Sequence, residues 1–101
     1  MIKNISILGS TGSIGTQALE VVEDLGNINI YALSANTRID LLEQQIRKYK
    51  PIVAAVMDTG KAQELRYRIK DTNTRVVAGL EGFVEIASLP QVDMVLTSVV
   101  G

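Results

Sequence analysis

Three glycines near the amino terminus constrain the fold of this chain more than any other feature. Gly9, Gly12 and Gly15 are spaced three residues apart and come directly after an apolar run at residues 5–8. A segment typical of an amphipathic helix follows, over residues 13–25. Glycine at the first position lets the chain turn sharply off a strand, and glycine at the third lets a helix pack closely. The pattern therefore predicts a strand, a tight turn and a helix in immediate succession.

A corner of this kind is suited to bind phosphate groups. The helix start presents unpaired N–H groups and partial positive charge, and Gly12 lets a pyrophosphate approach the backbone. The hydroxyls of Ser10, Thr11 and Ser13 add hydrogen-bonding groups. The spacing is G-x-x-G-x-x-G rather than the commoner G-x-G-x-x-G, so a tight turn without a ligand is the alternative interpretation. With the flanking strand and helix, the pattern favours dinucleotide binding.

Short apolar strands alternate with helical segments along the rest of the chain. The pattern predicts strands at residues 3–8, 29–34, 52–57, 75–78 and 92–100, with helices at 13–25, about 37–49, 59–70 and 79–87. Asn36 or Thr37 would cap the second helix. The fourth helix would bury Leu80, Phe83, Val84 and Ile86. This alternation predicts an α/β fold, a doubly wound parallel sheet of about five strands with helices on both faces. We expect strand order 3-2-1-4-5, which places the glycine-rich turn at the topological switch point of a Rossmann-like sheet.

Composition limits the classes of function that remain. The chain has 101 residues, which suits a single domain, and its net charge of −1 gives no basic surface for nucleic acid. The absence of cysteine and histidine removes thiol chemistry and the commonest general base. No apolar run is long enough to span a bilayer. We therefore expect a cytoplasmic protein that binds neither nucleic acid nor membranes, and no catalytic or metal-binding residue can be named in this chain.

The end of the second predicted strand bears on the choice between NAD and NADP. An acidic residue at this place binds the ribose 2′-hydroxyl of NAD, whereas neutral or basic residues admit the 2′-phosphate of NADP. Here Ala35, Asn36, Thr37 and Arg38 follow one another without an acid. The polar side chains of Asn36 and Thr37 can donate hydrogen bonds, and the Arg38 guanidinium can pair with phosphate. The segment favours NADP, although Asp40 would oppose a phosphate if the helix began later.

Several segments of the sequence together resemble one enzyme family. They are ILGSTGSIG at residues 7–15, ALSAN at 32–36, LEQQ at 42–45 with Tyr49 and Pro51, AVMD at 55–58, Val92-Asp93 and VVG at 99–101. These segments resemble the opening of the 1-deoxy-D-xylulose 5-phosphate reductoisomerase family. The resemblance extends over essentially the whole chain but over only the N-terminal part of a family member. We therefore expect residues 1–101 to be the NADP-binding domain of a larger protein.

The resemblance also carries expectations about function. It implies an NADPH-dependent enzyme that converts the phosphosugar 1-deoxy-D-xylulose 5-phosphate to 2-C-methyl-D-erythritol 4-phosphate in non-mevalonate isoprenoid biosynthesis. A divalent metal, Mg²⁺ or Mn²⁺, serves the larger enzyme, which the resemblance implies is a homodimer. The metal ligands, the substrate lysine and the active-site loop would lie beyond Gly101, so the chain alone would be inactive. The cofactor residues implied by the motif and the resemblance are Gly9, Thr11, Gly12, Ser13, Ile14, Ala35, Asn36, Thr37 and Arg38.

Two other interpretations fit parts of the sequence. One is the nucleotide-binding domain of another NADP-linked reductase, such as a semialdehyde dehydrogenase or an extended short-chain dehydrogenase. The latter class needs a Tyr-x-x-x-Lys pair, and the residue four places after Tyr67 is Asp71. The other interpretation is a stand-alone nucleotide-sensing domain. We place both behind the reductoisomerase interpretation.

Overall fold

The computed structural model describes residues 3–97, which form a parallel β-sheet with helices on both faces. The elements along the chain are β1 (Lys3–Leu8), α1 (Ser13–Leu25), β2 (Ile28–Ala35), α2 (Ile39–Tyr49), β3 (Val53–Val56), α3 (Thr59–Arg68), β4 (Arg75–Ala78), α4 (Gly79–Ala87) and β5 (Met94–Thr97). The predicted alternation of strands and helices is confirmed. The predicted fifth strand extended to residue 100, and residues 98–100 lie outside the described range.

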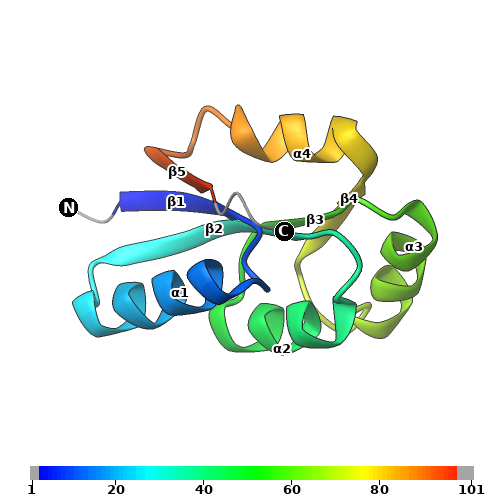
Figure 1. Cartoon of the computed structure of the whole chain (residues 1–101), viewed down its shortest axis with the longest axis horizontal. Coiled ribbons are helices and arrows are strands. Elements are labelled where there is room, and N and C mark those ends of the chain that lie inside the picture. Colours follow the sequence, from blue (N-terminus) through cyan, green and yellow to red (C-terminus); the bar gives the residue numbers. More distant parts are fainter. Residues whose placement is uncertain (1–2, 98–101) are drawn as a thin grey trace.

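The layers follow from where the apolar side chains point. Helices α1, α2 and α3 cover one face of the sheet, and α4 runs alone across the other (Figure 1). The larger core joins the sheet to the first three helices and includes Ile7, Leu33 and Leu65. A smaller core beneath α4 is built around Ile86, Ala32 and Val53. Strand β3 is buried along its whole length, as expected for a strand covered on both faces.

The order of the strands differs from the one expected. The sheet has the order β4-β3-β2-β1-β5, so β4 pairs with β3, and β5 pairs with β1. The expected order 3-2-1-4-5 is therefore wrong in the position of β4. Both orders satisfy right-handed crossovers, so the handedness rule alone could not separate them. Helix α3 packs beside α2, and this placement puts β4 next to β3. Helix α4 then brings the chain back across the opposite face, so that β5 lies beside β1.

The doubly wound character of the fold survives this correction. The chain leaves β1 toward β2 through α1, and it reaches the other side of β1 through α4 and β5. Connections on opposite faces therefore diverge at the carboxyl end of β1. The glycine-rich turn still occupies the topological switch point, where ligands bind in open α/β sheets.

Helix α4 buries only part of the predicted set: Ile86 is buried and Phe83 packs against the smaller core as predicted, but Leu80 and Val84 are not buried. Gly82 and Ile86 face the sheet, whereas Leu80 and Val84 are well exposed. A Cβ atom at Gly82 would lie only 3.0 Å from the carbonyl carbon of Val77. The helix therefore approaches β4 through its glycine, and this rotation turns Leu80 and Val84 away from the core. None of the helices within the described range has the length and apolar character needed to cross a lipid bilayer.

Candidate functional site

The glycine-rich turn begins where β1 ends. Gly9 has a φ of 79°, a left-handed conformation that side chains rarely tolerate, and it turns the chain away from the strand. The Gly12 N–H then donates to the Gly9 carbonyl oxygen at 3.1 Å, which closes the turn. Gly12 is the N-cap residue of α1 and has an ordinary extended backbone, with a φ of −78°. The predicted sequence of strand, tight turn and helix is confirmed.

Gly15 brings the first turn of α1 against the turn that precedes it. A Cβ atom there would lie 2.3 Å from the Gly9 carbonyl oxygen and 2.6 Å from the Ser10 Cα atom. Both atoms belong to the backbone, so rotation of a side chain could not relieve the clash. Only glycine permits this contact, which fixes where the helix start lies relative to β1.

The start of α1 has the features of an anion-binding site. No side chain caps the helix, and its first turn contains no acidic residue. The first N–H groups of a helix have no intrahelical partner, and the aligned peptide dipoles give this end partial positive charge. Ser13 and Ile14, the first two helical residues, are exposed. Phosphate oxygens could therefore reach the backbone of Gly12, Ser13 and Ile14 from solvent.

The three hydroxyls of the turn do not have equal access to a ligand. Ser10 is fully buried, and its hydroxyl is directed into the protein, where it donates to Gln45 Oε1 at 2.8 Å. Thr11 is 6% exposed, whereas Ser13 is exposed. The Ser10 hydroxyl is therefore not available to a nucleotide. Ser13 is the best placed of the three, and Thr11 has only a small exposed part.

The second predicted segment follows β2 at the same edge of the sheet. The side chain of Ala35 lies in the core, and its carbonyl oxygen accepts a hydrogen bond from the Met57 N–H. Asn36, Thr37 and Arg38 are exposed. The structure thus leaves three polar side chains accessible after β2, while Ala35 could meet a ligand only through its backbone.

Helix α2 starts later than predicted. It begins at Ile39 with Arg38 as its N-cap residue, and no side chain caps it. The prediction that Asn36 or Thr37 caps this helix is therefore wrong. The Thr37 carbonyl oxygen instead accepts from the Ile39 N–H at 2.8 Å, which folds the segment into a tight turn before the helix. The side chains of Asn36 and Thr37 consequently belong to the loop.

Arg38 joins the two segments of the candidate site. Its Nη1 atom donates to the carbonyl oxygen of Thr11 at 3.2 Å, across the gap between the loop after β2 and the glycine-rich turn. The side chain is accessible to solvent, and a guanidinium has further N–H groups with which to bind an anion. The structure therefore brings the two predicted segments together around one cation.

Asp40 lies in the first turn of α2, close to this cation in the sequence, but its charge is compensated. Its carboxylate accepts a hydrogen bond from Arg68 of α3, and this bond lowers the pKa of Asp40 below its ordinary value. Arg68 also pairs with Glu43 and Glu64. The sequence does not predict this ion pair, because no local pattern links residues 40 and 68.

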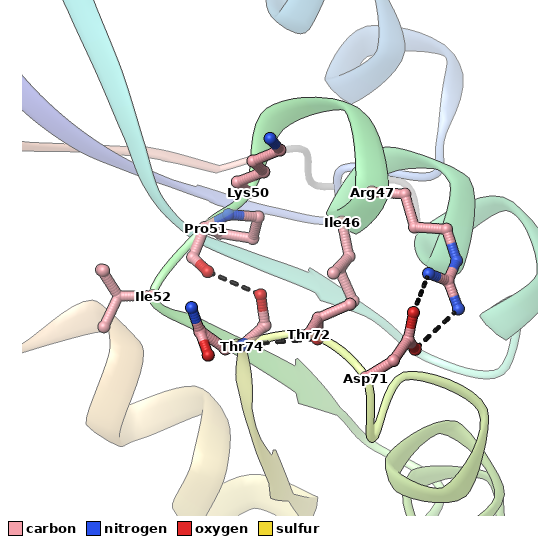
Figure 2. Close-up of a pocket in the computed structure, with 9 residues that line it drawn as sticks. Ile46, Arg47, Lys50, Pro51, Ile52, Asp71, Thr72 and Thr74 are labelled. Atoms are coloured by element: carbon pink, nitrogen blue, oxygen red, sulfur yellow. Dashed lines mark hydrogen bonds and ion pairs between the residues drawn. The ribbon is translucent and has the colours of Figure 1, made fainter.

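A pocket at the opposite end of the sheet has a different character. It is lined by residues that precede β3 and β4, among them Pro51, Ile52 and Thr74 (Figure 2). Figure 2 shows the Arg47 guanidinium directed at the Asp71 carboxylate at one side of this pocket. The hydrogen bonds from Arg47 lower the pKa of Asp71. Since ligands of open parallel sheets bind at the carboxyl ends of the strands, this pocket is not the predicted nucleotide site.

Within residues 3–97, no group of three or more His, Cys, Asp or Glu side chains is arranged to hold a metal ion.

Comparison with known proteins identifies the family of this chain. Residues 5–101 match the family model of 1-deoxy-D-xylulose 5-phosphate reductoisomerase. The chain belongs to the 1-deoxy-D-xylulose 5-phosphate reductoisomerase family. This membership confirms the resemblance and favours it over other NADP-linked reductases.

Relatives of known name and structure agree with this membership. The chain is 46% identical to a 1-deoxy-D-xylulose 5-phosphate reductoisomerase of Lachnoclostridium phytofermentans over 98% of its own length and 26% of the relative's. It is 49% identical to 1-deoxy-D-xylulose 5-phosphate reductoisomerase 1 of Bacillus cereus, over 100% and 26% of the two chains. A crystal structure of a DOX-P reductoisomerase with NADPH, fosmidomycin and magnesium superposes with a TM-score of 0.88 at 30% identity, covering 93% of this chain and 24% of that one. The chain thus spans about a quarter of the length of these reductoisomerases.

Proposed function

We propose that this chain is an NADPH-binding domain of the reductoisomerase family and that the cofactor lies across the carboxyl ends of β1 and β2. The observation that carries the proposal is the accessible, glycine-lined start of α1 with Arg38 directly beside it. The structural relative that contains NADPH shares this fold, which supports the choice of cofactor. The proposed contact residues are Gly9, Thr11, Gly12, Ser13, Ile14, Ala35, Asn36, Thr37 and Arg38.

The pyrophosphate would take the start of α1. There, the backbone N–H groups of Ser13 and Ile14 can donate to its oxygens, and the helix dipole favours their negative charge. Gly12 has no side chain to hold the phosphates away from the backbone. Gly9 gives the turn its shape, and Gly15 allows the start of α1 to pack against that turn.

The ribose 2′-phosphate would take the loop after β2. Arg38 supplies the positive charge, and the exposed side chains of Asn36 and Thr37 supply hydrogen-bond donors. Asp40 is the one acid nearby in the sequence, and its ion pair with Arg68 compensates its charge. Because the Asp40 carboxylate is paired, it does not stand as an uncompensated negative charge against a phosphate at this place. The positive charge of Arg38 therefore favours NADPH over NADH.

In a protein of its relatives' length, we propose that this domain delivers NADPH to an enzyme that converts 1-deoxy-D-xylulose 5-phosphate to 2-C-methyl-D-erythritol 4-phosphate. The names of the relatives supply the substrate. A divalent metal, Mg²⁺ or Mn²⁺, would be held by residues outside this chain and would activate the substrate's oxygens. Residues 1–101 would hold and orient the cofactor, and the chain alone would be inactive. We further propose a cytoplasmic homodimeric enzyme that binds no nucleic acid or membrane.

Substitution of Gly12 by valine tests the proposed pyrophosphate site. The Gly12 backbone is extended, so valine can adopt its conformation, and binding rather than folding should respond. We expect Gly12→Val to weaken NADPH binding by roughly tenfold or more, because the branched side chain blocks the approach of phosphate to N–H groups worth about 1–2 kcal/mol each. Calorimetric titration of NADPH into both proteins measures the change.

The control is Ala87→Val, which adds two methyl groups at an exposed position near the end of α4, away from the proposed site. It should bind NADPH like the wild type, and thermal melts should show both variants folded. If folded Gly12→Val titrates identically to the wild type, the pyrophosphate does not lie at Gly12 and the proposed site is wrong.

A further inference from the structure

One polar residue interrupts the buried face of α2. Gln45 is only 5% exposed, and its neighbours on the same face, Leu42 and Ile46, are almost completely buried. An amide placed in an apolar interior costs free energy unless its oxygen and nitrogen find hydrogen-bond partners. A buried glutamine at such a position therefore calls for a specific partner.

Both ends of the Gln45 amide bind the same residue of the glycine-rich turn. Gln45 Nε2 donates to the Ser10 carbonyl oxygen at 2.8 Å, and Gln45 Oε1 accepts from the Ser10 hydroxyl at 2.8 Å. The pair joins residues 35 positions apart in the sequence. The amide thus fixes the position of Ser10 and the orientation of its carbonyl group.

The end of β2 holds the same turn from its other side. The Ser10 N–H donates to the Ser34 carbonyl oxygen at 2.9 Å, and the Gly9 N–H donates to Ser34 Oγ at 2.8 Å. Ser10 itself is 0% exposed, so it cannot touch a ligand. Its contacts with Gln45 and Ser34 can therefore influence binding only by holding the exposed part of the turn.

We propose that Gln45 is a positioning residue, which holds the glycine-rich turn through Ser10 in the conformation that binds the nucleotide pyrophosphate. The inference rests on the proposed NADPH site and adds to it a residue that never contacts the cofactor. The turn contains Gly9 and Gly12, and glycine gives the chain many alternative conformations. Restricting them before the ligand arrives lowers the entropic cost of binding.

This role makes a prediction about cofactor choice that differs from that for Arg38. NADPH and NADH share the pyrophosphate, so loosening the turn should weaken both by the same factor. A residue that binds the 2′-phosphate should instead affect NADPH binding much more than NADH binding. The ratio of the two affinities therefore separates the positioning role of Gln45 from direct recognition of the phosphate.

The test compares Gln45→Met with Gln44→Met by titrating NADPH and NADH into each. Methionine keeps the length of the buried side chain and removes both hydrogen bonds, whereas Gln44 is exposed on the same helix. We expect Gln45→Met to bind both nucleotides about tenfold more weakly with an unchanged ratio, as for one to two lost hydrogen bonds. Hydrogen exchange at the Gly12 amide, which is bonded to the Gly9 carbonyl oxygen, should also become faster. The Gln44→Met protein should match the wild type in all three measurements.

Each other outcome is decisive. If Gln45→Met has a lower melting temperature but wild-type affinity for both nucleotides, its role is purely structural and the inference is wrong, while the proposed site stands. A loss confined to NADPH would also overturn it. If the wild type binds neither nucleotide, the proposed function fails first.

Should Gln45→Met not fold, Ser10→Ala replaces it, since this removes only the bond to Gln45 Oε1 and the hydroxyl's bond to the Ser34 carbonyl oxygen. A smaller but equal loss for both nucleotides is expected, and unchanged affinity would overturn the inference.

Discussion

Gly15→Ala should strongly lower the free energy of unfolding of this protein. The new Cβ atom would lie 2.3 Å from the Gly9 carbonyl oxygen and 2.6 Å from the Ser10 Cα atom, well inside contact distance. Relief requires the start of α1 to move off the turn, because backbone atoms cannot rotate away. Overpacking of this kind costs about 3 kcal/mol. For a domain of this size we expect the melting temperature to fall by roughly 10 °C or more.

Gly60→Ala is the matched control, since Gly60 also lies in the first turn of a helix. A Cβ atom there would meet only Asp58 Oδ1 at 3.4 Å, which is an ordinary contact. Alanine is the better helix former, so this variant should be unchanged or slightly more stable. Chemical denaturation of both variants gives the comparison. Equal stability of Gly15→Ala and the wild type would show that the close contact between α1 and the turn is not needed.

Arg38→Ala should separate the two cofactors. If Arg38 binds the ribose 2′-phosphate, its removal should weaken NADPH binding by about 1–3 kcal/mol, roughly fivefold to 150-fold, as for charge-assisted hydrogen bonds. The bond from Arg38 Nη1 to the Thr11 carbonyl oxygen is lost as well. That loss affects the binding of both cofactors, and a partly buried hydrogen bond of this kind contributes about 0.5–1 kcal/mol. NADH should therefore weaken only slightly.

Two further variants sharpen this comparison. Arg38→Lys keeps the charge but loses the planar fork, so it should retain part of the preference for NADPH. Arg66→Ala removes an arginine that binds the Val76 carbonyl oxygen instead, and it should leave the affinity ratio unchanged. Equal losses of NADPH and NADH in Arg38→Ala would mean that this residue acts only by bracing the turn. A wild-type preference for NADH would overturn the choice of NADP itself.

The local geometry of the site could be predicted from the sequence because it depends on neighbouring residues. Glycine spacing after an apolar run predicted the turn at Gly9 and the helix start at Ser13, and both are confirmed. Asp58 directly precedes α3, and its side chain accepts from the Lys61 N–H as the N-cap of that helix, an arrangement that a local sequence pattern can indicate. In each case the deciding atoms lie within a few residues of one another.

Features that depend on distant partners could not be predicted in the same way. The predicted position of β4 was wrong because right-handed crossovers allow β4 to pair with either β1 or β3. The packing of α3 beside α2 places it next to β3. The predicted cap of α2 was wrong because the Thr37 carbonyl oxygen accepts from the Ile39 N–H in a turn, and the helix begins only at Ile39. Gln45 was visible as a polar residue within an apolar stripe, but nothing local pointed to Ser10 as its partner.

A map of backbone amide chemical shifts, recorded as NADPH is added to the protein, tests where the cofactor binds. We expect the largest changes at Gly12, Ser13 and Ile14 and in the loop from Asn36 to Arg38, and NADH should reproduce the first set more strongly than the second. Shifts concentrated around Ile52 and Thr74, at the pocket on the opposite end of the sheet, would contradict the proposed site. So would a titration in which no amide responds.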